Sequence, residues 1–282
     1  MKSKQWQKRN GCLKGGGINN KIMPKKKIGL AGPIKIKECI PIKIKVIMPV
    51  ISDIFNEEIR REIKSYVFEN TEVGVCNLDY GPESIESEYD EALCIPNFLE
   101  KAKQAQDEGY QGVISDCFGD PGVKPAREIL DIPVVGPCES SLLVASSLAK
   151  SFSIVTVLPN VVPMIENISK TLGVDGNVAS IRYVNIPVLE IQDKEKLKNA
   201  LFDEMIKAIE QDKAHALVLG CTGFMGVATE LQERLSQKGY DVPVIDPAFA
   251  ATKMLETLIA MGVKQSRLTY MTPPSKQRVK RS

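Results

Sequence analysis

The sequence predicts an α/β protein of two similar, pseudo-symmetric lobes, each with a mostly parallel sheet flanked by helices. We expect one active site, in the cleft between the two lobes. From about residue 43, β-branched runs alternate with amphipathic stretches, which is the pattern of βαβ units. The second half of the chain then repeats the order of the first at a shift of a little over 100 residues. Two copies of one α/β unit explain both observations.

The composition excludes several classes of protein. Of the 282 residues, 43% are hydrophobic and 26% are charged, and no apolar run approaches the roughly 18 residues of a membrane span. Residues 1–45 hold 13 Lys and Arg against one acid, 46–262 hold 18 against 34, and 263–282 hold six against none. The acidic body argues against a nucleic-acid groove in the fold, so we expect the basic ends to be solvated tails.

The repeat and the charge pattern together predict the domain boundaries. We expect a basic, disordered extension at 1–42, a first lobe at 43–145, a second lobe at 146–247 and a basic tail at 263–282. The last helix, 248–262, is placed to cross back and complete the first lobe. The start of the chain has no hydrophobic region of a secretory signal, and seven cysteines are an odd number, so we expect reduced thiols in the cytoplasm.

Each element of the first lobe has a local signal. Ile59, Ile63 and Val67 recur at helical spacing, and Asp53 suits an N-cap before them. Gly109 suits the position after a helix end. The expected elements are a strand at 42–50, a helix at 54–67, a strand at 71–78, a helix at 91–108 and a strand at 112–117.

The repeat pairs these elements with the second half. By similarity of sequence, 45–52 corresponds to 152–160, 111–123 to 215–227, and 132–137 to 242–247. The third pair of segments is followed by helices at 139–150 and 248–262, and Asp246 suits the N-cap of the second.

The repeat places Cys117 and Cys221 at equivalent points, each at the carboxyl end of a buried strand and before a glycine-containing turn. Ligands of parallel α/β sheets bind beyond these strand ends, so we expect the two thiols to face each other across the cleft. Turn N–H groups and a helix N-terminus would lower the thiol pKa and hold an anionic ligand. One sulfur can then serve as a base and the other as an acid.

The other candidate residues carry weaker signals. We interpret Cys12, Cys39, Cys76, Cys94 and Cys138 as small hydrophobic residues. His215, the one histidine, begins a strand away from its cysteine end, and the cysteines form no CxxC pair, so we expect no metal site. Asp116 and Asp120 flank Cys117, and both an orienting role and a solvated turn remain open for them. No nucleotide motif is present, and we expect no cofactor.

The motifs SDCFGDPG, followed by an Arg-Glu dipeptide and IPVVG, and LGCTGF resemble the aspartate/glutamate/hydantoin racemase superfamily, and most closely its hydantoin and allantoin racemase branch. The resemblance covers about 43–262. It implies cofactor-independent racemisation in which Cys117 and Cys221 act on opposite faces of a substrate carbon. It also implies a substrate pocket formed by Pro49, Ser52, Phe118, Gly119, Thr156 and Thr222.

The sequence departs from that branch after the first strand, where an Asn-Pro-Asn-Thr/Ser stretch is usual and Met48-Pro49-Val50-Ile51-Ser52 stands here. The substrate therefore remains open between a hydantoin-like ring and an amino acid. We expect a racemase or epimerase with a small-molecule substrate and no membrane or nucleic-acid partner, and the sequence is compatible with a homo-oligomer. The alternatives are a two-cysteine isomerase or decarboxylase of the same fold, and a non-catalytic binding protein.

Overall fold

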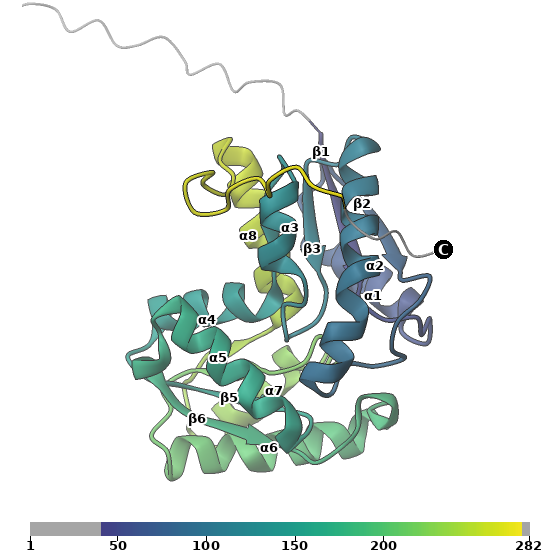
Figure 1. Cartoon of the computed structure of the whole chain (residues 1–282). Helices are drawn as coiled ribbons and strands as arrows, with labels where there is room; N and C mark the ends of the chain where they lie inside the picture. The colour runs from purple at the N-terminus through teal and green to yellow at the C-terminus, as the bar shows by residue number, and fades with distance from the viewer. Residues whose placement is uncertain (1–40, 278–282) are drawn as a thin grey trace, which may run out of the picture. The chain divides into compact units, whose positions relative to one another are not determined.

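The computed structural model describes residues 41–277, which form two four-stranded sheets (Figure 1). The first sheet has the order β2-β1-β3-β4 and the second the order β6-β5-β7-β8, and all neighbouring strands are parallel. The strands of the first sheet are β1 (Ile42–Met48), β2 (Thr71–Asn77), β3 (Gly112–Ser115) and β4 (Val134–Val135). Those of the second are β5 (Phe152–Thr156), β6 (Val178–Tyr183), β7 (Leu217–Leu219) and β8 (Val244–Ile245). The identical strand orders confirm the predicted fold class and the internal repeat.

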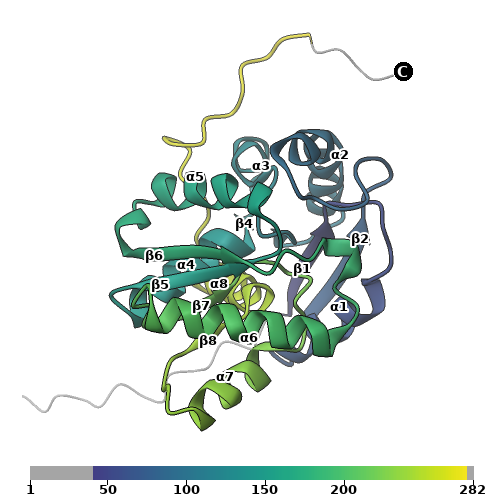
Figure 2. The ribbon, with the colours of Figure 1, turned by 90° about the horizontal axis from the view of Figure 1, so that it is seen from below.

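Helices flank both sheets, and Figure 2 shows α5 and α6 beside the second one. Short 3₁₀ turns lie at Pro159–Val161, Asp175–Asn177 and Val188–Glu190. The helices are α1 (Asn56–Tyr66), α2 (Glu88–Asp107), α3 (Val123–Ile129), α4 (Pro137–Leu148), α5 (Val162–Leu172), α6 (Lys194–Glu210), α7 (Ala228–Gln237) and α8 (Pro247–Met261).

Helix ends follow the local signals at some places and not at others. Gly109 has φ +83° directly after the end of α2, as predicted. Asp246 caps α8, because its carboxylate accepts the N–H of Phe249 at 2.8 Å. The prediction that Asp53 is an N-cap is wrong: α1 begins only at Asn56, whose N–H is bonded to the carbonyl of Asp53 in a preceding turn.

The helices that follow β4 and β8 are exchanged between the sheets. Helix α4 packs on β7 and β8, whereas α8 packs on β3, β4 and α1, and the two helices contact each other. Leu255 and Ala251 of α8 are fully buried in the core of the first sheet, with Ile44 and Val46. This exchange joins the lobes through a shared helical layer, and the boundary near residue 145 stays a prediction.

The two basic ends differ in what the structure describes. Of the extension predicted at 1–42, residues 1–40 lie outside the described part of the chain. The C-terminal tail is not wholly solvated, which corrects our expectation. Gln265 donates to the carbonyls of Leu130 and Ile132 at 2.8 and 3.0 Å, and Arg267 is paired with Asp131 at 2.9 Å. These hydrogen bonds hold the start of the tail against the loop between α3 and β4.

Among the described residues, no helix is both long enough and apolar enough to cross a membrane.

Candidate active site

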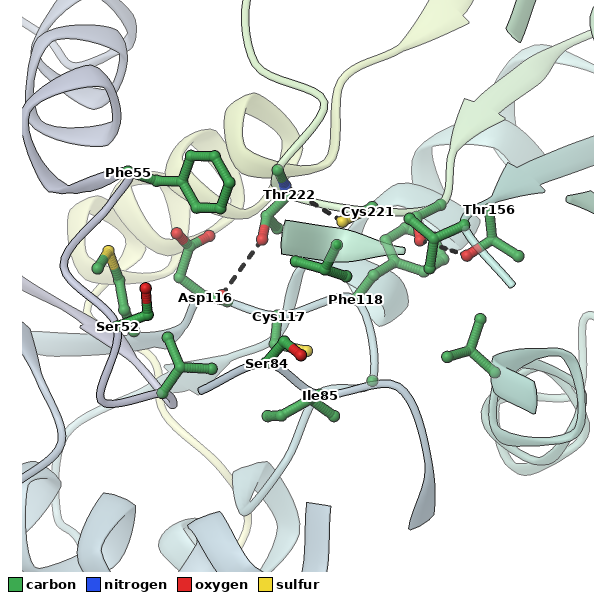
Figure 3. A pocket seen from close by; sticks show the side chains of 18 of the residues that line it. Ser52, Phe55, Ser84, Ile85, Asp116, Cys117, Phe118, Thr156, Cys221 and Thr222 are labelled. Carbon is green, nitrogen blue, oxygen red and sulfur yellow. Dashed lines mark hydrogen bonds between the residues drawn. The ribbon is translucent and has the colours of Figure 1, made fainter. Parts of the chain in front are cut away.

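A cavity of about 820 Å³, counting its open mouth, lies where the carboxyl ends of the two sheets meet (Figure 3). In the first sheet the strand order reverses between β1 and β3, and in the second between β5 and β7. Such reversal points leave a crevice beyond the strand ends because the following loops diverge. The chain segments after β1, β3, β5 and β7 all contribute to the lining.

Cys117 and Cys221 line this one cavity from opposite lobes. Cys117 follows β3 by two residues and Cys221 follows β7 by two residues. Both are partly exposed to the cavity. The two turns also contact each other, since Thr222 donates its hydroxyl to the main-chain carbonyl of Asp116 at 3.2 Å. The tertiary structure therefore brings together the two residues that the repeat made equivalent.

The thiols are less acidic than the sequence suggested. Burial raises the pKa of Cys117 well above its ordinary value and that of Cys221 to about 12. A hydrogen bond from the Gly223 N–H to Cys221 Sγ, at 3.3 Å, lowers the pKa of that thiol, but desolvation is the larger effect. Helices α3 and α7 begin six and seven residues after the cysteines, too far along the chain to offset it.

The segment after β1 presents alternate residues to the cavity. Met48, Val50 and Ser52 line it, whereas Pro49 is buried and does not, and Ile51 is exposed. The structure thus supports Ser52 as a lining residue and places Pro49 outside the lining.

The remaining predicted binding residues all line the cavity: Phe118, Gly119, Thr156 and Thr222. Thr156 is fully buried, and its hydroxyl donates to the carbonyl of Gly220 at 2.8 Å. That bond fixes the residue before Cys221, so the Thr156 hydroxyl supports the cysteine turn rather than pointing free into the cavity.

The two aspartates beside Cys117 have different surroundings. Asp120 has φ +50°, and its carboxylate accepts main-chain N–H groups of Cys138 and Glu139 at the start of α4, both at 2.8 Å. Asp116 is 6% exposed and lines the cavity. Neither is a solvated turn residue, which resolves the alternative left open by the sequence.

Several lining residues carried no sequence signal. Glu83, Ser84 and Ile85 come from the polar loop before α2, Phe55 and Ile59 from the start of α1, and Met164 and Ile165 from α5. Loop residues have no periodicity that would mark them, and apolar helical residues look like core. Only the packing of the lobes shows that these side chains meet at the cavity.

The lining is mostly apolar, and its carboxyl groups belong to Glu83 and Asp116. The described lining residues include no Lys, Arg or His. A ligand that brings two carboxylates would therefore meet no opposite charge here. This charge balance favours an uncharged polar ligand.

The other cysteines and the histidine lie elsewhere. Cys94 and Cys138 are fully buried in the core, as expected for small hydrophobic residues, and Cys76 packs against it. Cys12 and Cys39 fall outside the described residues. His215 is exposed just before β7, at the opposite end of that strand from Cys221.

Comparisons with known proteins agree with this arrangement. The model of the family Asp/Glu/Hydantoin racemase matches residues 44–255. The chain is 40% identical to a hydantoin racemase of Pseudomonas sp. (strain NS671) over 239 residues, which are 84% of this chain and 94% of that protein. It is 35% identical to a hydantoin racemase of Rhizobium meliloti over 206 residues, 72% of this chain and 83% of that protein. The solved allantoin racemase from Klebsiella pneumoniae superposes with a TM-score of 0.79 at 32% identity, covering 85% of this chain and 96% of that one.

Proposed function

Because the chain belongs to the Asp/Glu/Hydantoin racemase family, and is thus the isomerase its motifs predicted, we propose that it racemises a neutral, hydantoin-type ring by means of Cys117 and Cys221. The observation that carries this proposal is the placement of the two thiols. They follow equivalent strands of the two lobes and line one cavity.

In the proposed step, the thiolate of one cysteine removes the proton from the stereogenic carbon. The C–H bond breaks, an S–H bond forms, and the electron pair moves to the neighbouring carbonyl oxygen to give an enolate. The thiol of the opposite cysteine then gives its proton to the other face of the carbon, and the carbonyl is restored. The two sulfurs end with exchanged protonation, so the enzyme is ready for the reverse reaction.

The raised pKa values of the two thiols shape this mechanism. A strongly basic thiolate is well matched to a weakly acidic C–H bond. The main-chain N–H group of Phe118, in the turn after Cys117, is the donor that we assign to the enolate oxygen. The N–H of Gly119 instead donates to the Cys117 thiol.

The substrate class follows from charge and polarity. Free aspartate and glutamate carry two carboxylates, which the acidic, cation-free lining does not complement. A hydantoin ring is uncharged, and an apolar substituent on its stereogenic carbon would contact side chains such as Val50, Phe55 and Met164. The relatives named as hydantoin racemases support the same choice.

The test is incubation of the protein with single enantiomers of 5-substituted hydantoins, allantoin, aspartate and glutamate in D₂O. We expect loss of optical rotation for hydantoins with apolar substituents, with deuterium at the stereogenic carbon and no effect of a chelator. Racemisation of aspartate or glutamate in preference to hydantoins contradicts the substrate class. No exchange with any of these compounds contradicts the racemase mechanism.

We also propose a cytoplasmic location, because an odd number of cysteines, seven, favours reduced thiols.

A further inference from the structure

One polar side chain in the cavity has no role in the steps above. Asp116 is 6% exposed, and its Oδ1 is buried without a hydrogen-bond partner. Figure 3 shows its carboxyl group directed between Ser52, Phe55 and Thr222, in the space that a ligand would occupy. A buried polar atom left unpaired is costly, about 1–3 kcal/mol, so a native protein that keeps one usually has a use for it.

The surroundings of Asp116 favour its neutral form. Glu62 of α1 and Asp246 at the start of α8 are close enough to repel a charge on it. These two acids are bridged by Tyr66, whose hydroxyl lies 2.7 Å from Glu62 Oε1 and 3.3 Å from Asp246 Oδ2. Burial first, and then these two charges, raise the pKa of Asp116 to about 7. At neutral pH a large share of the molecules therefore carry a carboxylic acid here.

Asp116 also affects the catalytic thiols that we have proposed. It adjoins Cys117 in the chain, and its charge is among the causes that raise the pKa of Cys221. The other charges acting on Cys221 are Glu86, which raises its pKa, and Lys194, which lowers it. An ionised Asp116 would oppose both the thiolate and the enolate, because like charges in a poorly solvated site repel strongly.

We propose that Asp116 acts as a neutral acid in the site and donates its O–H to the substrate carbonyl oxygen that becomes the enolate oxygen. This role rests on the proposed racemase function. The donor stabilises charge that develops only as the C–H bond breaks, so it speeds the chemical step. Asp116 donates a hydrogen bond but keeps its proton, so the proton transfers between the carbon and the two sulfurs remain as described above.

The opposite assignment is an Asp116 carboxylate that accepts a ring N–H. The amide of Asn can donate through its NH₂ group or accept through its oxygen, so it can replace either, whereas Ala can replace neither. The two assignments differ in pH dependence, since a neutral acid is lost as pH rises through about 7 and a carboxylate is gained.

The experiment compares wild type, Asp116→Asn and Asp116→Ala by kcat/KM for a hydantoin between pH 5.5 and 9. We expect wild-type activity to level off or fall above about pH 7, although thiolate increases with pH. Asp116→Asn should stay within about tenfold of wild type at pH 6 and continue to rise with pH. Asp116→Ala should lose about 100-fold or more, as for other oxyanion donors. Asp175→Asn, which changes an exposed acid outside the cavity lining, should keep the wild-type pH profile.

A second measurement needs no substrate. The rate at which iodoacetamide alkylates Cys221, followed by mass spectrometry, reports its thiolate fraction. At pH 8 we expect at least a threefold faster rate in Asp116→Asn than in wild type, because a negative neighbour is removed.

The outcomes separate the two proposals. Two results overturn the donor role alone, provided that the wild type racemises a hydantoin. One is an Asp116→Asn variant as inactive as Asp116→Ala, and the other is a wild-type kcat/KM that keeps rising above about pH 7. No racemisation by wild type overturns the function and the donor role together, even if the alkylation rates differ.

Discussion

The Asp120 carboxylate ties the turn after Cys117 to the helix that follows β4, because its Oδ1 accepts the N–H of Cys138 at 2.8 Å. Oδ2 accepts the N–H of Glu139 at the same distance. Gly136 lets the carboxylate approach so closely, since a Cβ at that position would lie 2.1 Å from the Asp120 carboxyl carbon. Helix α4 in turn packs on the second sheet, so this contact relates the first cysteine turn to the opposite lobe.

Replacing Asp120 should therefore affect both stability and catalysis. Asp120→Ala leaves two N–H groups of α4 without their acceptor, and we expect a loss of about 1–3 kcal/mol in the free energy of unfolding. Asp120→Asn keeps one acceptor oxygen, and its free energy of unfolding should lie between those of wild type and Asp120→Ala. The Ala variant should also lower kcat, because the Cys117 turn loses its support. Urea titration and steady-state kinetics measure the two effects, and Asp175→Ala, which removes an exposed acid, serves as control. Equal effects of the two Ala variants would contradict this role.

Thr156 offers a test of the second cysteine turn. Thr156→Val removes the hydroxyl that donates to Gly220 while keeping the volume, and Thr156→Ser keeps the hydroxyl. We expect Val to cost about 1 kcal/mol of stability and about tenfold in kcat, and Ser to restore most of the kcat. Wild-type kcat in Thr156→Val would contradict the role of the hydrogen bond.

The two thiols should differ in which enantiomer they serve. Cys117→Ser and Cys221→Ser should each abolish full racemisation, because a hydroxyl is far too weak a base at neutral pH. The remaining thiolate can still remove and return a proton on its own face. In D₂O, each variant should deuterate one enantiomer with retention, and the two variants should choose opposite enantiomers. Chiral chromatography with mass detection measures this. Wild-type racemisation by either variant contradicts the two-thiol mechanism.

The buried carboxyl of Asp116 should make stability depend on pH. Its pKa is about 7 in the folded chain and 3.8 as the ordinary value, so between these pH values the folded state holds a proton that the unfolded state has lost. The contribution of Asp116 to the free energy of unfolding is greatest below about pH 4, decreases as pH rises towards 7, and is constant above that. Asp116→Asn removes this fall, which should raise the free energy of unfolding at pH 8 by a few kcal/mol more than at pH 4. Denaturation at both pH values tests it, and an equal change at both would contradict the raised pKa.

Helix α8 is anchored on the first sheet by a fully buried acid. Glu256 Oε1 accepts the N–H of Phe68 at 2.8 Å and the Thr71 hydroxyl at 2.6 Å, and Oε2 is paired with Lys253 at 2.9 Å. Glu256→Ala removes the shared acceptor of these partly exposed donors, and we expect a loss of about 1–3 kcal/mol. Glu233→Ala on α7, at an exposed position, should change stability by less than about 0.5 kcal/mol. A small effect of Glu256→Ala would contradict the anchoring role.

Much of the fold could be predicted from local patterns. The β-branched runs at β1, β3, β5 and β7, and the glycine after α2, depend on neighbours in the chain alone. The start of α1 could not be predicted from local patterns, because aspartate is favoured both in turns and at N-caps. In the structure Asp53 forms a turn with Asn56, and the helix begins after it. The sequence predicted that α8 completes the first lobe, but not that α4 packs on the second sheet. The sheet on which a helix packs depends on which lobe offers it an apolar surface.

The candidate site divides in the same way. The internal repeat by itself determined that Cys117 and Cys221 are equivalent and end strands of parallel sheets, because similar sequences form similar βα turns. Only the tertiary structure decided that Pro49 faces away from the cavity and that the loop at Glu83 and the helix α5 contribute to it. It also decided that both thiols are weakly acidic and that Asp116 has an unpaired oxygen. Desolvation and the distances between charges depend on every element packed around a group, and these neighbours are far apart in the sequence.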